Sequence, residues 1–579
     1  MSISNLQMSL VHSLRFQDAD FNLTAANYNA FSQRTALWDP NMGGTERSAD
    51  MTFVYNGYGE LKTQTDAKDQ SISFTYDLLG RMKKRNAPNI EDLWDYDHPD
   101  AIGQLEYMRR NQNGQTVYER DFSYDAFARS TGHTTSINNT SSGQAQTFEV
   151  QIQPDGYFGR PVSMIYPTAF AAQALPLQTY HLYDKDGYLT REGLGRDLVN
   201  ASSPQTAPYY RKINNMSPRD QLENVSYGNL ATDTWSYGPA NGQMSSMVSS
   251  VPGGGQLANL AYDYDDFGNL IEHDKHLLDV RETFFYDQLH RLLLRDFDVL
   301  PGGDGPGGPL APEPQPMPFE YPEGVSYSYD ALGNITGKSD YANNYEYDHV
   351  KHQICANSGL NSLAEHPGPH AVTQVTAQVK SFNGGTTPQD YRMAYDANGN
   401  LICSEDGTLT VRYDAYNLPT SIQRGITTQT FHYGPDLQRY RQVMGLNTET
   451  LYIDKLYERK GNIERFYIGG YLVIERNSAG TEKQSYTHKD RLGSTVAITD
   501  EAGDIKVQQG FGPFGKARNE NWTASNNLPG KALDSRGFTD HEHLENTRLI
   551  HMTKPAWSRF ERRNWTPIPH IPQHRLDQA

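Results

Sequence analysis

The densest group of potential metal ligands lies near the carboxyl end of the sequence, at His541, Glu542, His543 and His551. Imidazole nitrogens and carboxylate oxygens bind zinc, and His541 and His543 would point to one face if they lie on a strand. A zinc site needs three or four fixed ligands and a supporting set of hydrogen bonds. The pattern specifies neither, so we expect no metal site and keep metal binding as the alternative.

Aspartates recur along the chain, each directly after a tyrosine. Paired carboxylates could do acid–base chemistry or bind calcium, but calcium loops need an acidic run of the Asp-x-Asp-x-Asp-Gly kind. Here each aspartate is followed by turn residues instead. Because Asp side chains accept hydrogen bonds from backbone N–H groups two residues on, we expect these residues to cap turns: Asp77, Asp125, Asp265, Asp330 and Asp396.

Nucleophile and nucleotide motifs are missing from the sequence. It contains no Gly-x-Ser-x-Gly elbow, Walker loop or Rossmann glycine signature. Cys355 and Cys403 have no histidine at a telling spacing, and we expect packed or incidental thiols. We therefore predict that the protein is not an enzyme and has no cofactor.

Length and charge exclude further classes. The chain has 579 residues with 51 Lys and Arg against 69 Asp and Glu, which gives a net charge of −18. Such a chain is a poor general partner for nucleic acid, because phosphate contacts need clustered cations. No stretch approaches the roughly 20 apolar residues of a membrane-spanning helix. The amino-terminal residues have neither a basic nor an apolar segment, so we expect no Sec signal peptide.

The abundance of tyrosine and glycine points to strands and tight turns. Tyr occurs 37 times and Gly 49 times, whereas hydrophobic residues make up only 36% of the chain. Tyr favours strands, and Gly permits the positive φ of tight turns. This composition indicates an all-β protein of many short strands and excludes a helical bundle.

A Tyr-Asp repeat runs along most of the sequence. A glycine often stands three residues after the aspartate, and an Arg or Asn then leads into an apolar residue such as Met82 or Leu270. Alternating large and small side chains before the tyrosine predict a strand, and the glycine closes a hairpin turn. The structural repeat motif consists of Tyr76, Asp77, Gly80, Tyr124, Asp125, Tyr264, Asp265, Gly268, Tyr329, Asp330, Gly333, Tyr395, Asp396 and Gly399.

The spacing of the tyrosines defines one hairpin per repeat. Neighbouring copies such as Tyr55, Tyr76 and Tyr96 stand about 20 residues apart, which fits two strands of roughly 5–6 residues and two turns. No single hairpin can bury its own face, so neighbouring hairpins must join into one continuous sheet.

These residues resemble the YD-repeat, or Rhs, family, and the resemblance covers roughly residues 50–552. It is most specific from Tyr486 to Lys516, which is similar to the Rhs repeat-associated core, and from Arg536 to Met552, which is similar to the plug segment of the family. The core motif comprises Asp490, Leu492, Gly493, Ser494, Thr495, Phe511, Gly512, Pro513, Phe514 and Gly515. Among these, we expect Gly493, Gly512 and Gly515 to need backbone freedom that a Cβ forbids.

The resemblance implies a long sheet that spirals into a shell. In polymorphic toxins and toxin-complex C components such a shell encloses a carboxyl-terminal toxin, the core closes one end, and an aspartyl motif releases the toxin by self-cleavage. Teneurin-like proteins use a related shell for adhesion. The plug of the family carries histidines of the same kind without a metal role.

The sequence departs from the family after Met552. The family continues with Asn-Gly-Arg and a Tyr-Asp-Pro step, but residues 553–579 are rich in Pro, Trp and Arg. Arg559 and Arg563 beside Trp565 could contact nucleic acid by charge and stacking. Because the tail lacks any period, we expect a disordered, out-of-frame extension and no nucleic-acid partner. The cleavage motif and the toxin are therefore expected to be absent.

The sequence thus predicts an all-β protein of repeated β-hairpins in a large spiralling sheet, and it leaves open whether this shell is complete. We expect a degenerate segment at 1–50, the shell at 51–480 with a Pro/Gly-rich insertion at 300–323, the core at 481–552 and the atypical tail at 553–579. The expected function is that of a non-catalytic shell fragment of a toxin-delivery protein. Its expected partners are a toxin domain or a shell partner like a toxin-complex B component. The alternative is a carbohydrate-binding or adhesion protein. We expect secretion or surface display by a dedicated secretion system.

Overall fold

The computed structural model describes residues 13–18, 22–42, 49–138, 140–170, 175–194, 208–299, 324–347, 367–380, 386–404, 408–445, 448–520, 525, 528–547 and 549–551. Within these ranges the protein is all-β, as the repeat predicts, and contains no α-helix. A short 3-10 turn is the only helical element in this part of the chain, and it is not long and apolar enough to cross a membrane. The expected insertion at 300–323, Cys355 and the tail at 553–579 lie outside the described residues.

Forty strands form one sheet, and two short hairpins follow it. The first part of the sheet contains β1 Ser13–Gln17, β2 Leu23–Tyr28, β3 Arg34–Trp38, β4 Met51–Tyr55, β5 Leu61–Thr65, β6 Ser71–Tyr76, β7 Met82–Ala87, β8 Ile90–His98, β9 Ala101–Gln112, β10 Gln115–Tyr124, β11 Ser130–Ile137, β12 Gln146–Pro154, β13 Pro161–Ile165, β14 Gln178–Tyr183, β15 Leu189–Leu194, β16 Arg211–Met216, β17 Leu222–Tyr227, β18 Thr232–Tyr237, β19 Met244–Ser250, β20 Gln256–Tyr264, β21 Leu270–Lys275, β22 Val280–Tyr286, β23 Leu292–Val299, β24 Val325–Tyr329 and β25 Ile335–Lys338.

The second part of the sheet contains β26 Ala342–Glu346, β27 Gln374–Lys380, β28 Thr386–Tyr395, β29 Leu401–Ser404, β30 Leu409–Tyr413, β31 Pro419–Arg424, β32 Thr427–Tyr433, β33 Arg439–Met444, β34 Thr448–Ile453, β35 Tyr457–Lys460, β36 Ile463–Ile468, β37 Leu472–Asn477, β38 Glu482–Lys489, β39 Thr495–Asp500 and β40 Ile505–Gln508. The hairpin β41 Gly510–Phe511 and β42 Ala517–Arg518, the 3-10 turn η4 Phe538–Asp540 and the hairpin β43 Glu542–His543 and β44 Ile550–His551 complete the chain.

Each strand of the sheet pairs antiparallel with the next one in sequence, so the sheet is a ribbon with two edges. Turns that follow even-numbered strands form one edge, and they carry the Tyr-Asp motifs. For example, β6 pairs with β7 through Tyr76 and Met82. We call this the Tyr-turn edge. Turns that follow odd-numbered strands, such as the one after Thr65, form the opposite, plain edge.

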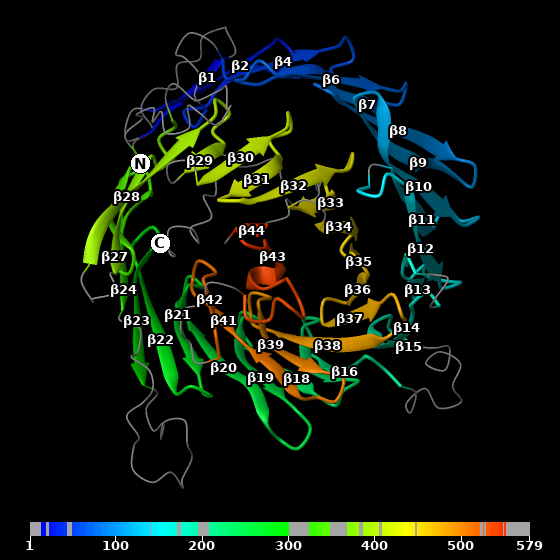
Figure 1. Cartoon of the computed structure of the whole chain (residues 1–579), viewed down its shortest axis with the longest axis vertical. Coiled ribbons are helices and arrows are strands. Elements are labelled where there is room, and N and C mark those ends of the chain that lie inside the picture. Colours follow the sequence, from blue (N-terminus) through cyan, green and yellow to red (C-terminus); the bar gives the residue numbers. More distant parts are fainter. Residues whose placement is uncertain are drawn as a thin grey trace.

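The ribbon coils into a ring with a second winding inside the first (Figure 1). The first winding spans β1–β25 and the second β26–β40. Hydrogen bonds join Lys68 to Asp396, 328 residues apart, and Gln508 to Leu257, only 251 residues apart. Between these two points of contact, the first winding runs from residue 68 to residue 257, whereas the second needs only the residues from 396 to 508. The spiral tightens, which places the second winding inside the first.

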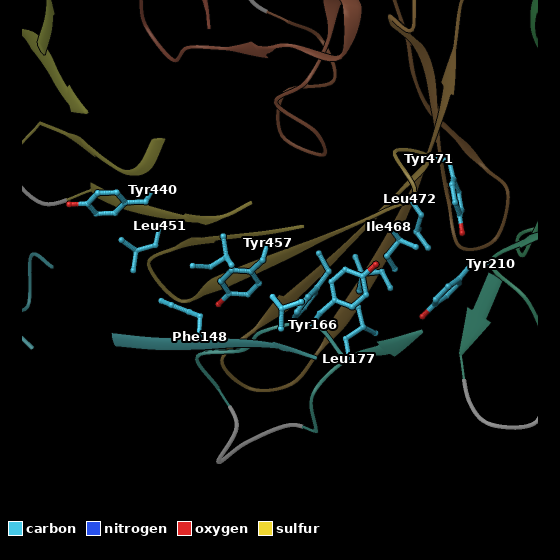
Figure 2. Close-up of a cluster of buried hydrophobic side chains, with 14 of the residues drawn as sticks. Phe148, Tyr166, Leu177, Tyr210, Tyr440, Leu451, Tyr457, Ile468, Tyr471 and Leu472 are labelled. Atoms are coloured by element: carbon cyan, nitrogen blue, oxygen red, sulfur yellow. The ribbon is translucent and has the colours of Figure 1, made fainter. Parts of the chain in front are cut away.

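The largest hydrophobic core lies where the two windings overlap. Phe148, Tyr166 and Tyr210, close to the plain edge of the first winding, pack with Tyr457, Leu472 and their neighbours from the second (Figure 2). Because aromatic side chains bury large areas, they supply most of the apolar contact of a thin sheet. The two windings thus share one hydrophobic core, and neither winding supplies all of its residues.

A segment near the carboxyl end, residues 528–547 and 549–551, packs inside the second winding, and we call it the plug (Figure 1). Its Leu544 and Leu549 join a core with Leu409, Ile422 and Phe431 of the second winding. The core region expected at 481–552 does not begin a separate sheet, because β38 pairs with β37 through Tyr486 and Leu472.

Candidate functional site

Most turns that follow the even-numbered strands share one local structure, and we call each of them a Tyr-turn. In the turn after β6, Asp77 Oδ1 accepts hydrogen bonds from the backbone N–H groups of Leu79 and Arg81, both at 2.9 Å. Gly80 closes this turn with φ +76°, in the left-handed region that favours glycine. The capping and the positive φ match the turn predicted from the sequence. They recur at the Asp265, Asp330 and Asp396 turns.

Several Tyr-turns close without glycine. Residues at the position of Gly80 are also left-handed where the side chain is larger, as in Ala128 (φ 58°), His290 (φ 60°) and Leu437 (φ 63°). A side chain with a Cβ is strained there. The geometry of these turns therefore does not depend on glycine alone. The aspartate cap and the backbone hydrogen bonds between the two strands also impose it.

The repeated tyrosine has a role that the sequence does not reveal. The Tyr76 hydroxyl donates to the backbone carbonyl of Leu61 at 2.9 Å, and Leu61 is the first residue after the preceding Tyr-turn. The Tyr286 hydroxyl donates in the same way to Leu270 at 2.8 Å. The same bond recurs at Tyr96, Tyr237, Tyr264, Tyr329, Tyr347, Tyr395, Tyr413 and Tyr433. Each tyrosine therefore fastens its own turn to the previous one.

The arginine at the end of a Tyr-turn extends this connection forwards. Arg81 pairs with Asp77 of its own turn at 2.6 Å and with Asp97 of the next at 2.8 Å. Its guanidinium also lies over the ring of Tyr96, 4.5 Å from the centroid. Hydrogen bonds from Arg81 lower the pKa of Asp97 to about 2. These contacts are structural and leave the carboxylates engaged within the turns.

The core motif begins with one more turn of the same kind. Asp490 Oδ1 accepts from the N–H groups of Leu492 and Ser494, and Gly493 has φ +79°. Lys489 replaces the tyrosine, which is why the repeat is hidden here. Ser494 and Thr495 are fully buried, and Ser494 Oγ accepts a hydrogen bond from Thr539 N of the plug. This turn therefore holds the plug.

The second half of the core motif is a turn between β41 and β42. Phe511 packs against Phe538 of the plug at 5.7 Å, and Phe514 packs against Tyr327 of the first winding at 5.5 Å. Pro513 is exposed. Gly515 has φ +81°, whereas Gly512 is not left-handed and a Cβ there would meet its nearest atom at 3.7 Å. The expectation that Gly512 needs backbone freedom is therefore wrong.

The histidines of the plug do not converge on one point. His543 Nε2 accepts a hydrogen bond from Phe538 N, and His541 Nδ1 lies 2.8 Å from Thr539 Oγ1. Glu542 is paired with Arg439 of β33. Burial lowers the pKa of His543 to about 4 and that of His551 to about 3. Within the described ranges no three His, Cys, Asp or Glu side chains are grouped to hold a metal ion.

The arrangement nearest to a catalytic triad lies between the windings. Asp233 Oδ1 of β18 is 2.7 Å from His488 Nδ1 of β38, and His488 Nε2 is 3.2 Å from Thr499 Oγ1 of β39. A nucleophile, a base and an orienting acid share this order. However, all three residues are buried, with side-chain exposures of 1% for Asp233 and 0% for His488. Asn229 Nδ2 also donates to Thr499 Oγ1 at 2.9 Å. The group fastens the windings together.

A second polar contact joins the windings at Asp92. This carboxylate of β8 is buried and accepts from both Arg85 and Arg110. Tyr416, in the Tyr-turn after β30 of the second winding, donates to the same carboxylate at 3.2 Å. The Tyr416 ring also lies below both guanidinium groups, at 4.4 Å from Arg85 and 5.4 Å from Arg110. An aromatic turn residue thus sits on an arginine–carboxylate cluster.

Cys403 in β29 is fully buried and disulfide-bonded. The expectation of a packed side chain is confirmed, because Cys403 lies in a buried cluster with Ala394 and Ile402. The expectation of a thiol is wrong for this residue, because its sulfur is in a disulfide.

The fold is similar to that of solved toxin-complex assemblies. Crystal structures of TcdB2–TccC3, alone and with Cdc42, match over 92% and 90% of this chain, each with a TM-score of 0.58 and 12% identity. The Tc holotoxin pore of Photorhabdus luminescens matches over 90%, also at 0.58 and 12%. This chain spans less than a third of each matched chain, between 27% and 29%. The likeness at this identity concerns the fold alone.

Sequence comparison adds no relative. No protein-family model matches the chain. No curated protein matches it either.

Proposed function

We propose that the protein is a non-catalytic wall segment of a toxin-encapsulating shell. One observation carries this proposal: a single hairpin sheet winds twice around a plug that is formed by its own carboxyl-terminal residues (Figure 1). The similarity of this fold to the TcdB2–TccC3 assemblies supports the same class of function. A polypeptide that continues from His551 would start inside the second winding, which suits an enclosed cargo.

A structural role for the polar groups supports the non-catalytic part of the proposal. The Asp233, His488 and Thr499 group has no exposed side chain from which a substrate could be bound. The cargo in this proposal is a toxin domain, and the protein partner is another shell component. Export by a dedicated secretion system belongs to the same proposal.

Protease protection tests the proposal directly. A short unfolded reporter with a protease site is appended after Ala579, and the same reporter is placed before Met1 as the matched control. Enclosure predicts that the carboxyl-terminal reporter is cleaved at least tenfold more slowly than the amino-terminal one in the intact protein. Equal cleavage rates would contradict a shell that encloses the polypeptide beyond the plug.

Exposed aromatic side chains support one second candidate, carbohydrate binding. Tyr58 and Tyr157 are more than 90% exposed at the tips of Tyr-turns, and such rings could stack on sugars. Binding of the full chain to defined glycans on an array, lost in the Tyr58→Ala and Tyr157→Ala variants, would favour this function.

A further inference from the structure

The tips of many Tyr-turns in the first winding are apolar. The tip is the second residue after the capping residue, and its backbone N–H donates to the capping side chain, as Phe127 N does to Asp125 Oδ1 at 2.9 Å. This position is occupied in seven turns of the first winding by Phe31, Tyr58, Leu79, Phe127, Tyr157, Phe267 and Leu289. These seven side chains are between 69% and 93% exposed. We call this set of tips the apolar rim.

Strongly exposed aromatic side chains are confined to these turns. In the part of the chain that the structure describes, the aromatic side chains that are more than two-thirds exposed are Phe31, Tyr58, Phe127, Tyr157, Phe158 and Phe267. Phe158 directly follows the tip residue Tyr157, and the other five are tips. Apolar residues scattered singly over a surface need no explanation. Their segregation to one edge of the sheet is not scatter, and it indicates a binding surface.

Tips that bind another winding use polar groups instead. At the equivalent position of two Tyr-turns in the second winding, Asn398 Nδ2 donates to Asp66 at 2.6 Å and the Tyr416 hydroxyl donates to Asp92 at 3.2 Å. A phenylalanine or leucine tip, such as Phe127, has no group that could make either bond. The chemistry that joins the two windings therefore does not suit the apolar rim, so a further winding is not the occupant that these side chains favour.

The polar groups beneath the apolar rim are already bonded within their own turns. Asp125 pairs with Arg129 at 2.6 Å, and Asn56 Nδ2 donates to Glu60 at 2.7 Å. The capping side chain is bonded in the same way in the five other turns of the rim. These turns can therefore leave water without an unpaired polar side chain, which would carry a large cost. The same closed pairs leave few groups for hydrogen bonds to a sugar.

From this geometry we propose that the apolar rim binds the surface of an electrically neutral lipid bilayer, a function beyond that of an enclosing wall. Aromatic rings favour the membrane–water interface, and binding there grows with the apolar area that is buried. Phe31, Tyr58 and Leu79 lie on three successive Tyr-turns, roughly 10 Å apart. Each tip can insert separately, so the polar gaps between tips do not prevent binding. The net charge of −18 opposes binding to anionic lipids.

Flotation of the full chain with phosphatidylcholine vesicles tests the lipid surface. The wild type should float with these vesicles, and less of it should float when phosphatidylserine is added, because the anionic lipid repels the acidic chain. The double variant Tyr58→Ser with Phe127→Ser should lower the partition coefficient at least about tenfold, because it removes two rings from the apolar area that drives binding. Both side chains are exposed, so the melting temperature should stay that of the wild type.

A matched control separates the apolar rim from general surface hydrophobicity. Leu175→Ser with Ile426→Ser removes two apolar side chains on plain-edge connections that are 86% and 103% exposed, and this variant should float like the wild type. A wild type that does not float with phosphatidylcholine would overturn the proposal, and so would equal losses in both double variants or tighter binding to the anionic vesicles. Binding to a glycan array without binding to vesicles would assign the rim to carbohydrate instead.

Discussion

The hydroxyl of Tyr76 donates a hydrogen bond to the backbone carbonyl of Leu61, 2.9 Å away, on the strand that leaves the preceding turn. The repetition of this bond along the sheet explains why tyrosine is the most regular residue of the repeat. A phenylalanine would fill the same space but would leave the carbonyl without this donor. The tyrosine therefore sets the relation between one hairpin and the one before it.

Removal of the Tyr76 hydroxyl tests whether its hydrogen bond to Leu61 stabilises the hairpins. Tyr76→Phe should destabilise the hairpins around it by about 1 kcal/mol, the net contribution of a typical hydrogen bond. Hydrogen exchange of the β5 and β6 amides measures the effect. Tyr58→Phe, at an exposed turn tip, is the control and should change nothing. Equal protection in both variants would show that the tyrosine contributes only its ring.

Relief of backbone strain should stabilise the molecule. Ala128 closes its Tyr-turn at φ 58°, where a Cβ costs about 1–2 kcal/mol relative to glycine. Ala128→Gly should therefore raise the stability of this hairpin by about 1 kcal/mol, since the greater freedom of glycine in the unfolded chain offsets part of the gain. Gly80→Ala in the equivalent turn should have the opposite sign. Thermal unfolding measures the change in melting temperature of each variant relative to the wild type. A change of the same sign in both variants would show that Ala128 is not strained.

The contact between the windings should depend on the Asp92 carboxylate. Asp92→Asn removes the charge that Arg85 and Arg110 share and leaves a buried guanidinium without its counterion, at a cost of about 3 kcal/mol. Asp95→Asn, on the same strand, breaks only the partly exposed pair with Lys83 and should cost at most about 0.5 kcal/mol. Denaturant titrations compare the two. Similar losses would show that Asp92 does not hold the second winding.

The plug should respond to pH through Asp534. Burial raises the pKa of this carboxyl from 3.8 to about 6, so the folded plug binds the proton more tightly than the unfolded chain does. Stability is then greatest below pH 4 for this group and falls as the pH rises towards 6, by up to about 3 kcal/mol.

The variant Asp534→Asn should remove this dependence. Its amide oxygen can still accept the hydrogen bond that Arg536 N now donates to Asp534. Melting temperatures between pH 4 and 7 measure the slope, with Asp504→Asn at an exposed site as the control. A wild-type slope that persists in Asp534→Asn would assign the pH response to other groups.

Local features of the fold could be predicted from the sequence, and distant contacts could not. The roles of Asp77 and Gly80 depend on residues within one turn, so the motif reveals them. The acceptor of the Tyr76 hydroxyl is 15 residues away on another strand. The Asp233 and His488 pair is separated by 255 residues, and this distance is set by the number of hairpins in a winding. No spacing within a repeat encodes that number.

Electron cryomicroscopy of the full chain would test the central claim most directly, because the account depends on two concentric windings of one sheet. The account predicts a ring in which β26–β40 lie inside β1–β25, with residues 528–551 within the inner winding. An extended sheet with separated windings, or a plug outside the ring, would contradict it.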